Sequence, residues 1–592
     1  MTTDEIRQSF LDFFKNKSHQ KVDSASLIPA DPTALFTSAG MQQFVPYLSG
    51  GAEPPYNRAC SVQKCFRTSD IDEVGDEFHH TFFEMLGNLS FNDYFKEEVI
   101  QWALELLVDN YHLRKDRIWV TIFKGEKNIP GDKEAEKIWL ENGIAKERIK
   151  EFGSADNFWG PIGLIGPCGP CSEIYYDRGK EFQKNKCTLL KCGPNCGCGR
   201  FVEIWNLVFM KYNKTEKGEY EELVKQNIDT GAGLERLACV LQNKESNYET
   251  DLFLPIINEL EKISQKVNLS KQKSGRIIAD HIRAICFLIT DGVLPSKEDR
   301  GYILRRILRR AMRHGRLIEA EKGFLIPLAK IVINQYHNIY PELQNKKNDI
   351  LTIIQEEQEK FEKTLSQGLK KFKKIAQNTL KEGKKNIDSK TIFHLYDTYG
   401  FPLELTKEMA EEEGLEIDEK AFEKEFIHHK EISRAGAKKK FGGVGELGDK
   451  VAPYHTTTHL LHQALRQVLG NHVQQAGSDI TLERLRFDFT HSQKMTEEEI
   501  KKVEDVVNQK IKEGLEVKVE EMSYEQAIEK KALAFFKEKY PKIVKVYSIG
   551  DFSKEICAGP HVKNTNEIGV FKIVKEKASG SGVRRIKAVL NK

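Results

Sequence analysis

Hydrophobic and polar positions follow two different periods along this chain. In the first 240 or so residues, short β-branched and aromatic runs alternate with loops rich in Gly, Pro and Asn. The runs RIWVTIF (117–123) and FVEIWNLVFM (201–210) have the composition of strands. Because strands and helices do not alternate regularly here, the pattern predicts an antiparallel sheet with helices, in an α+β fold.

From about residue 245 to 435, apolar residues recur at helical spacings instead. The segments 275–293 and 301–317 are the clearest examples, and each predicts an amphipathic helix. The Lys- and Glu-rich segment 350–385 predicts a long exposed helix. A Gly-Phe-Pro turn within 393–406 interrupts this pattern.

A glycine-dense segment, RAGAKKKFGGVGELGDKVAP (434–453), predicts a flexible linker and a domain boundary. The rest of the chain mixes both periods again. It predicts helices at 455–470 and 496–513, strands at 484–490 and 545–553, and a final strand pair within 568–590.

Length and composition narrow the class of protein. At 592 residues the chain is too long for one hydrophobic core, and about three domains are expected. It has 40% hydrophobic and 30% charged residues, no apolar run long enough to span a bilayer, and a polar N-terminus. We therefore expect a cytoplasmic enzyme without a membrane segment. The net charge of +3 is too small to indicate a partner.

Six of the eleven cysteines lie between residues 168 and 198. In a reducing compartment such crowding favours metal binding over disulfide bonds. One interpretation is a structural zinc site with four cysteine ligands, in addition to the candidate metal site described next. The spacing of these cysteines in the sequence differs from that of a zinc ribbon. Its candidate ligands are Cys187, Cys192, Cys196 and Cys198.

Two pairs that are distant in sequence form another candidate metal site. His455 and His459 are four residues apart in YHTTTHLLHQ, so in a helix they share one face. That spacing alone favours ordinary surface or core histidines over a metal site. Cys557 and His561, in EICAGPHV, complete a set of soft and borderline ligands that suits tetrahedral Zn²⁺. His462 is left over, and we expect it at the surface.

Two segments are candidates for binding ATP. In CFRTSDIDEVGDEFHHTFFEML, the guanidinium group of Arg67 could bind the α-phosphate through several N–H donors. The ring of Phe83 could stack on the purine face. A plain amphipathic hairpin with a core aromatic ring fits the same pattern. In IDTGAGLERLACVLQ, two glycines precede a helix start that carries Arg236, and such a terminus suits a phosphate.

The segment 300–317 carries seven arginines and no acidic residue. We interpret it as a helix with a buried apolar stripe and a basic face. Such a face favours contact with nucleic-acid phosphates over a merely solvated surface. The arginines are Arg300, Arg305, Arg306, Arg309, Arg310, Arg313 and Arg316.

Together these segments resemble the class II alanyl-tRNA synthetases. The strings HHTFFEMLGN, GPCGPCSEIYYDRG, EIWNLVFMKYN and DTGAGLER carry the resemblance, which extends over essentially the whole chain. It implies a ligase that activates alanine with ATP and Mg²⁺, charges tRNA-Ala, and hydrolyses mischarged Ser-tRNA-Ala and Gly-tRNA-Ala. The implied parts are a catalytic domain (1–243), a helical tRNA-recognition domain (244–436), a linker (437–452) and a zinc-containing α+β editing domain (453–592).

The resemblance also assigns roles in alanine activation. Arg67 would bridge the α-phosphate and the substrate carboxylate, and Arg236 would lie on the γ-phosphate side. Asp229 would receive the alanine ammonium group, which agrees with the need of a buried charge for a partner. GPCGPC would be a loop without a redox role. The residues closing around the alanine methyl group would be Gly231, Val208 and Trp159.

The implied tRNA contacts depart from the family pattern at one position. Asp397 matches the aspartate at the G·U identity pair of the acceptor stem, but Lys297 stands where its companion asparagine is usual. The arginine helix would dock the acceptor stem. Its contacts would come from Arg305, Arg306, Arg309, Arg310 and Arg313.

The editing domain departs from the family pattern as well. Thr458 and Gln475 match its pocket residues, and Pro560 gives CAGPH where CGGTH is usual. Proline removes a backbone donor and a hydroxyl, so an altered editing rate or preference is expected. The implied zinc ligands are His455, His459, Cys557 and His561.

Two segments usual in the family are missing, a β-barrel before HTTTH and a module after RRIKAVL, which favours a monomer. Two other functions fit part of the sequence: a stand-alone deacylase with a vestigial first half, and an RNA-binding protein without catalysis. The intact Arg67, Asp229 and Arg236 favour the ligase, because neither alternative needs them.

Overall fold

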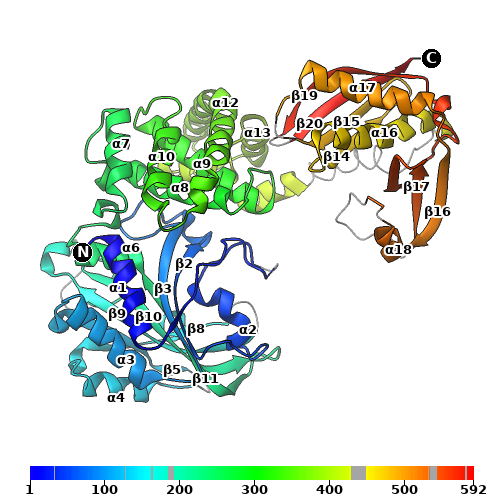
Figure 1. Ribbon diagram of the computed structural model, residues 1–592. Helices are drawn as coiled ribbons and strands as arrows, with labels where there is room; N and C mark the ends of the chain where they lie inside the picture. The colour runs from blue at the N-terminus through cyan, green and yellow to red at the C-terminus, as the bar shows by residue number, and fades with distance from the viewer. Residues whose placement is uncertain are drawn as a thin grey trace. The chain divides into compact units, whose positions relative to one another are not determined.

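The structure is a computed structural model, and it describes residues 1–31, 34–126, 129–161, 165–183, 192–427, 448–491, 493–530, 532–533, 543–580 and 583–591. The chain divides into two compact units (Figure 1). Unit 1 comprises Met1–Lys374 and Thr398–Met409, and unit 2 comprises Ile375–Asp397 and Ala410–Lys592. Most of the predicted linker lies outside the described residues.

Unit 1 is built on a nine-stranded sheet in the order β1-β2-β3-β11-β10-β9-β4-β7, with β8 paired to β9. Neighbouring strands from β2 to β4 run antiparallel, which confirms the predicted antiparallel sheet with helices. The strands are β1 Gln20–Lys21, β2 Arg58–Phe66, β3 Phe82–Phe91, β4 Ile118–Phe123, β7 Ile149–Phe152, β8 Phe158–Trp159, β9 Gly166–Asp177, β10 Phe201–Lys214 and β11 Tyr220–Gly233.

The expectation that GPCGPC forms a loop was wrong, because it lies within β9. The β9–β10 register shifts between Val208 and Tyr212, so the ladder is irregular where the prolines occur. Such a bulge tolerates residues that a regular ladder rejects. At Gly169 a side chain would collide with the backbone of Phe209, so the close approach of the two strands requires glycine.

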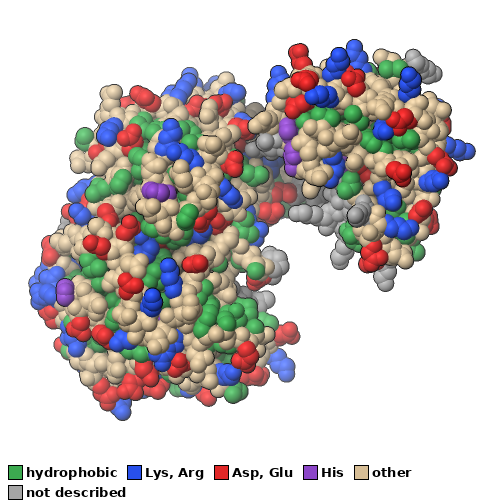
Figure 2. Space-filling model, viewed as in Figure 1, with side chains coloured by type: hydrophobic (Ala, Val, Ile, Leu, Met, Phe, Trp, Pro, Cys, Tyr) green, Lys and Arg blue, Asp and Glu red, His purple; other side chains and the backbone are tan. Residues whose placement is uncertain are grey.

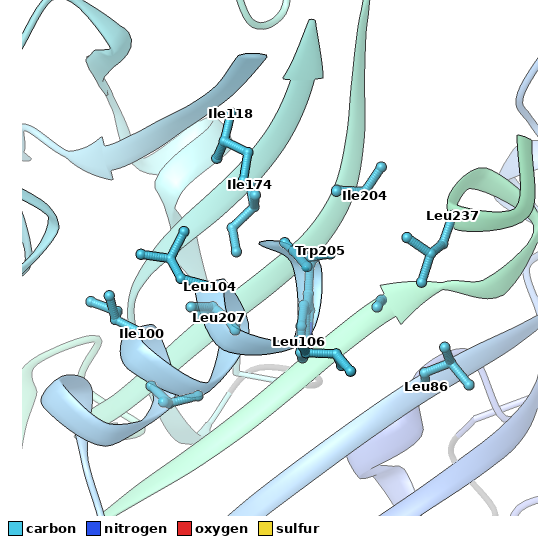
Figure 3. Packing of buried hydrophobic residues seen from close by; sticks show 14 of the residues in the cluster. Leu86, Ile100, Leu104, Leu106, Ile118, Ile174, Ile204, Trp205, Leu207 and Leu237 are labelled. Carbon is cyan, nitrogen blue, oxygen red and sulfur yellow. The ribbon is translucent and has the colours of Figure 1, made fainter. Parts of the chain in front are cut away.

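One face of the sheet is covered by α1 (Thr3–Asn16), α3 (Lys96–Leu104) and α6 (Leu234–Leu241). A capping box fixes the start of α1 at Thr2. Figure 3 shows side chains of α3, β9 and β10 gathered in this layer, among them Leu104, Ile174 and Leu207. The other face, which we call the open face, packs against η1 (Gly40–Phe44) and α2 (Val45–Leu48) and carries the polar groups described below.

The remainder of unit 1 is mainly helical. The main helices are α7 Leu254–Ser264, α8 Lys273–Thr290, α9 Asp299–Leu317, α10 Leu325–Tyr336 and α12 Lys347–Lys381, of which residues from Ile375 on belong to unit 2. The helices predicted at 275–293 and 301–317 are confirmed. The one predicted at 350–385 exists as the long helix α12, which is exposed on one side while Ile350, Ile354 and Phe361 are buried on the other.

The arginines of α9 do not form the unbalanced basic face that the sequence predicts. Glu357 of α12 lies 2.8 Å from Arg305 Nε and 2.7 Å from Arg309 Nη2. Glu408, on α14 (Leu403–Glu412), accepts hydrogen bonds from Arg310 Nη2 at 2.9 Å and from Arg310 Nε at 3.0 Å. The acidic partners come from segments far away in sequence, where a local window cannot detect them.

We expect Glu357→Ala to lower the free energy of unfolding of unit 1 by about 3–5 kcal/mol. Glu357 is 1% exposed, and its loss leaves two guanidinium groups without their shared carboxylate. Chemical denaturation followed by circular dichroism measures the change. The neighbouring Glu356→Ala is the matched control, because that carboxylate forms only a surface pair with Lys360, worth less than about 1 kcal/mol. Equal effects of the two variants would contradict the prediction.

Unit 2 contains α16 (Ala452–Leu469) and α17 (Glu497–Lys512) packed on a sheet in the order β14-β15-β20-β19. A second sheet has the order β16-β17-β18. The strand predicted at 545–553 is two strands, because Gly550 turns the chain with φ +50°. The strands are β14 Gln475–Ile480, β15 Leu485–Thr490, β16 Val517–Ser523, β17 Ile543–Ile549, β18 Ser553–Ile556, β19 Val570–Gly580 and β20 Val583–Asn591.

Acidic and basic side chains intermingle over the surface of each unit on the face drawn in Figure 2. None of the helices in the described part of the chain is both long and apolar enough to cross a bilayer.

Candidate active site and metal centres

The open face of the unit 1 sheet carries two rows of side chains across neighbouring strands. Asp229 of β11 is opposite Val208 of β10, which in turn is opposite Cys171 of β9. Gly231 and Asn206 are opposite each other in the next row. Directly paired residues of antiparallel strands project from the same face, so these residues share one surface.

Asp229 is the unusual group on this surface. The residue is 6% exposed, and its Oδ1 has no hydrogen-bond partner among the described residues. Burial raises the pKa of the Asp229 carboxyl from its ordinary 3.8 to about 8. A buried carboxylate without a partner is costly, so this position is suited to a cation that arrives from outside.

Apolar groups surround this carboxylate. Val208 belongs to a buried cluster against which Met85 and Trp159 pack. A Cβ at Gly231 would lie 2.8 Å from Met85 Sδ, so glycine is needed to leave room between β11 and that side chain. The structure thus brings the predicted Asp229, Val208, Gly231 and Trp159 to one region. Met85 was missed because a methionine in a strand carries no chemical signal.

Two cationic groups flank the same face. The Arg67 guanidinium, just after β2, lies 4.8 Å from the Phe83 ring centroid, and its Nε donates to the Ser38 carbonyl at 3.1 Å. Arg236, in the first turn of α6, donates to Glu203 Oε2 at 2.7 Å. Against the effect of burial, Glu203 holds the pKa of Arg236 above its usual value.

Sequence reasoning also missed a pair of acids beside Arg236. Glu173 of β9 is opposite Asn206, and burial together with the Glu203 charge raises the pKa of the Glu173 carboxyl to about 8. Both acids lie inside strings that carry the family resemblance, SEIYYDRG and EIWNLVFM. Carboxylate oxygens are the ligands that Mg²⁺ takes alongside substrate phosphates, so this pair of acids is a candidate cation site.

The candidate zinc ligands of unit 2 converge. His455 and His459 lie on α16, while Cys557 and His561 follow β18. The four ligand atoms all lie within 4.8 Å of one another, and Cys557 Sγ is 3.4 Å from His455 Nε2. Against the effect of burial, the three histidines lower the pKa of the Cys557 thiol to about 3, so it is the thiolate that a metal needs.

The remaining ring nitrogens show that these residues fit a metal. His561 Nδ1 lies 3.1 Å from Thr456 Oγ1, while its buried Nε2 has no hydrogen-bond partner among the described residues. His459 Nδ1 lies 2.8 Å from Glu555 Oε2, which leaves Nε2 for an ion. A carboxylate behind a histidine is the usual support of a zinc ligand.

The expectation that His462 lies at the surface was wrong. His462 is fully buried, and its Nδ1 lies 2.9 Å from Glu555 Oε1, so one carboxylate holds both His459 and His462. Glu555 was missed, although its position two residues before Cys557 in a strand was a usable signal. Thr458 donates to the His455 carbonyl at 2.7 Å, and Gln475 in β14 contacts Ser478 at 3.2 Å.

The candidate tRNA residues are distributed over both units. Lys297 is exposed just before α9 in unit 1, and Asp397 is exposed on α13 (Ser389–Tyr399) in unit 2. Within α9, Arg310 and Arg313 are 4% and 3% exposed, which leaves little of either for a phosphate. Three candidate cysteines, Cys192, Cys196 and Cys198, lie together in unit 1, and Cys187 lies outside the described residues.

Known proteins match this chain over its whole length. The model of "tRNA synthetases class II (A)" matches residues 5–478, and that of "Threonyl and Alanyl tRNA synthetase second additional domain" matches residues 544–587. The alanine–tRNA ligase of Borreliella afzelii is 49% identical over 599 residues, which cover 100% of both chains. The chain belongs to the alanine–tRNA ligase family.

Other members of the family differ in length. The ligase of Treponema denticola is 48% identical and covers 100% of this chain and 99% of its own. That of Petrotoga mobilis is 40% identical, and the match covers 99% of this chain but 80% of the longer relative. Membership of the family confirms the class II catalytic fold and the editing-type domain that the sequence predicts.

Proposed function

We propose that this chain activates alanine with ATP, transfers it to the 3′ end of tRNA-Ala, and hydrolyses mischarged Ser-tRNA-Ala and Gly-tRNA-Ala. In this proposal residues 1–243 catalyse charging, 244–436 recognise the acceptor stem and 453–592 edit. The observation that carries it is Asp229, a buried carboxylate without a partner among apolar side chains in the described part of the chain.

Alanine binds with its ammonium group on Asp229 and its methyl group against Val208, Trp159 and Gly231. Arg67 holds the α-phosphate of ATP and the alanine carboxylate, Phe83 the adenine, and Arg236 the γ-phosphate. The ionised carboxylate attacks the α-phosphorus and pyrophosphate leaves, so no general base is needed and catalysis is positioning and charge stabilisation. Mg²⁺ bound with ATP neutralises phosphate charge.

Editing follows from the limits of such a pocket. A site that fits a methyl group admits glycine and rejects serine only weakly, because one hydroxyl changes binding little in an apolar pocket. We propose that His455, His459, Cys557 and His561 hold Zn²⁺ beside an editing pocket that includes Thr458 and Gln475. Zinc supplies a Lewis acid there when bound. Pro560 offers neither a hydroxyl nor an N–H, so a changed preference between the two substrates is expected.

tRNA-Ala is the proposed macromolecular partner. Asp397 and Lys297 are proposed to contact the acceptor stem near its G·U pair. The arginine helix α9 is proposed to support the stem, chiefly through Arg305 and Arg309, which are less buried than Arg306, Arg310 and Arg313.

Alanine-dependent ATP–pyrophosphate exchange tests the proposal. Exchange that requires alanine, followed by charging of a tRNA-Ala transcript, is the expected result. Charging of a G·C variant transcript measures whether Lys297 has relaxed reading of the wobble pair. No exchange by folded, unaltered protein would refute the ligase and favour the deacylase or RNA-binding alternatives.

We expect Glu555→Gln to weaken zinc affinity about 10- to 100-fold, because this carboxylate orients His459. Competition with a chelator measures the change, and deacylation of Ser-tRNA-Ala falls with zinc occupancy. Glu516→Gln is the matched control, because Glu516 is exposed and pairs with Lys518 at the surface. Unchanged zinc affinity in Glu555→Gln would contradict the assignment.

A further inference from the structure

Three cysteines of unit 1 form a compact turn just before β10, which we call the cysteine turn (residues 192–200). Cys198 Sγ lies 3.1 Å from Cys196 Sγ and 3.6 Å from Cys192 Sγ. A disulfide needs about 2.05 Å, so the sulfurs are neighbours without being bonded. All three lie within 4.8 Å of one another, the geometry of ligands around a common ion.

The backbone conformation of the cysteine turn brings the three sulfurs together. Asn195, Gly197 and Gly199 have φ values of +64°, +65° and +82°, so left-handed residues alternate with the cysteines. Nothing lies within 4 Å of a Cβ built at Gly197, so glycine is present there for its backbone conformation and not for lack of space. The turn therefore directs successive thiols inward.

An ion pair holds the end of the cysteine turn against the sheet. Arg200 ends the turn and interacts with Cys192, and Asp177 of β9 is its main partner, at 2.5 Å. Metals bind cysteine as the thiolate, so zinc displaces the thiol protons when it binds. Three thiolates fill three positions of a tetrahedral zinc site.

We propose that the cysteine turn binds Zn²⁺ through Cys192, Cys196 and Cys198, as a structural site separate from the editing centre. The ion would close a turn that supports the catalytic sheet. Asn195 donates to Asp156 Oδ1 at 3.1 Å and accepts from the Tyr175 hydroxyl, which lies 3.0 Å from Glu173 Oε2. Glu173 is opposite Asn206 on the open face of the sheet, so these side chains are positioning residues for the adenylation site.

Metal stoichiometry tests the proposal on the full chain. Protein purified with zinc and without chelators is analysed by inductively coupled plasma mass spectrometry. Two zinc ions per chain are expected in the unaltered protein, one in Cys198→Ala and one in His455→Ala. One remaining ion in each single variant and none in the double variant would show that the two sites are independent. Cys286→Ala, a buried cysteine of α8, is the matched control and keeps both ions.

Several outcomes would overturn the proposal. A single zinc ion that His455→Ala removes, or an unchanged count in Cys198→Ala, means that the turn holds no zinc. Iron in place of zinc, or alkylation showing two oxidised thiols, refutes it as well. Should Cys198→Ala fail to fold, Cys196→Ala removes a less buried ligand. Cobalt substitution gives a second readout, because sulfur-to-cobalt charge transfer that persists in Cys557→Ala and disappears when Cys198→Ala is added comes from the cysteine turn.

The proposed site and the proposed activity fail separately. Alanine-dependent exchange by a protein with only one zinc ion would support the ligase activity and refute the zinc site in the cysteine turn. Two zinc ions in a protein that shows no exchange would support the zinc site in the cysteine turn and refute the ligase activity. If the turn positions Glu173, Cys198→Ala raises the KM for ATP more than it lowers kcat, whereas Cys286→Ala changes neither.

Discussion

Asp229→Asn is expected to lower kcat/KM for alanine in ATP–pyrophosphate exchange by two to four orders of magnitude. The substitution keeps the shape of the side chain but leaves a buried ammonium group without a counter-charge. Such a loss costs about 3–5 kcal/mol, and each 1.36 kcal/mol is tenfold. Asp488→Asn is the control, because this buried strand carboxylate pairs with Arg585 in unit 2 and should leave exchange unchanged.

Measuring the stability of Asp229→Asn distinguishes the loss of alanine binding from misfolding. The pKa of Asp229 is about 8 in the folded chain and near its ordinary 3.8 when unfolded, so the folded state binds the extra proton between these values. The Asp229 contribution to stability therefore falls as pH rises from 4 to 8. An asparagine side chain does not titrate, so the variant should be at least as stable as the unaltered protein at pH 8. A variant that is both inactive and markedly less stable would contradict this account.

The same group sets a pH dependence of alanine binding. Below pH 8 most of the free protein carries a protonated Asp229, which must lose its proton before it can pair with an ammonium group. In the unaltered chain, kcat/KM for alanine should rise about tenfold per pH unit toward pH 8, and this slope should vanish in Asp229→Asn. Initial rates of exchange across this range measure it.

The periodic parts of the chain were the predictable ones. Alternation in FVEIWNLVFM predicted β10, and the same alternation places Leu207 in the core and Val208 on the open face. The loop that the resemblance implied at GPCGPC was wrong, because an irregular ladder with β10 accommodates its prolines and glycines within β9. Local composition cannot reveal a register shift that depends on the partner strand.

Pairing over long sequence distances explains the other differences. The arginine helix was interpreted as a nucleic-acid surface because no acid lies within it, yet Glu357 and Glu408 reach it from α12 and α14. His462 was assigned to the surface because it lacked a ligand partner, yet Glu555 holds it in the core. Residue types identified ligands and charges, but only the fold identified which charges neutralise one another.

His455→Ala is expected to abolish deacylation of Ser-tRNA-Ala while leaving alanine activation unchanged. Even residues that only support a zinc ligand affect function 10- to 100-fold, so removing a ligand should lower deacylation of Ser-tRNA-Ala by at least about 100-fold. Alanine activation uses residues of unit 1 and should not change. The variant should therefore accumulate Ser-tRNA-Ala when serine is supplied with ATP.

His472→Ala is the matched control, because this exposed histidine of unit 2 lies 2.9 Å from His491 and outside the ligand set. Gly559→Ala offers an independent route to the same centre, since a Cβ there would collide with the His455 ring and displace it. Both His455→Ala and Gly559→Ala should lose deacylation together with one zinc ion. Full deacylation by either variant at reduced zinc content would show that hydrolysis does not use this centre, and the editing assignment would then have to move elsewhere in unit 2.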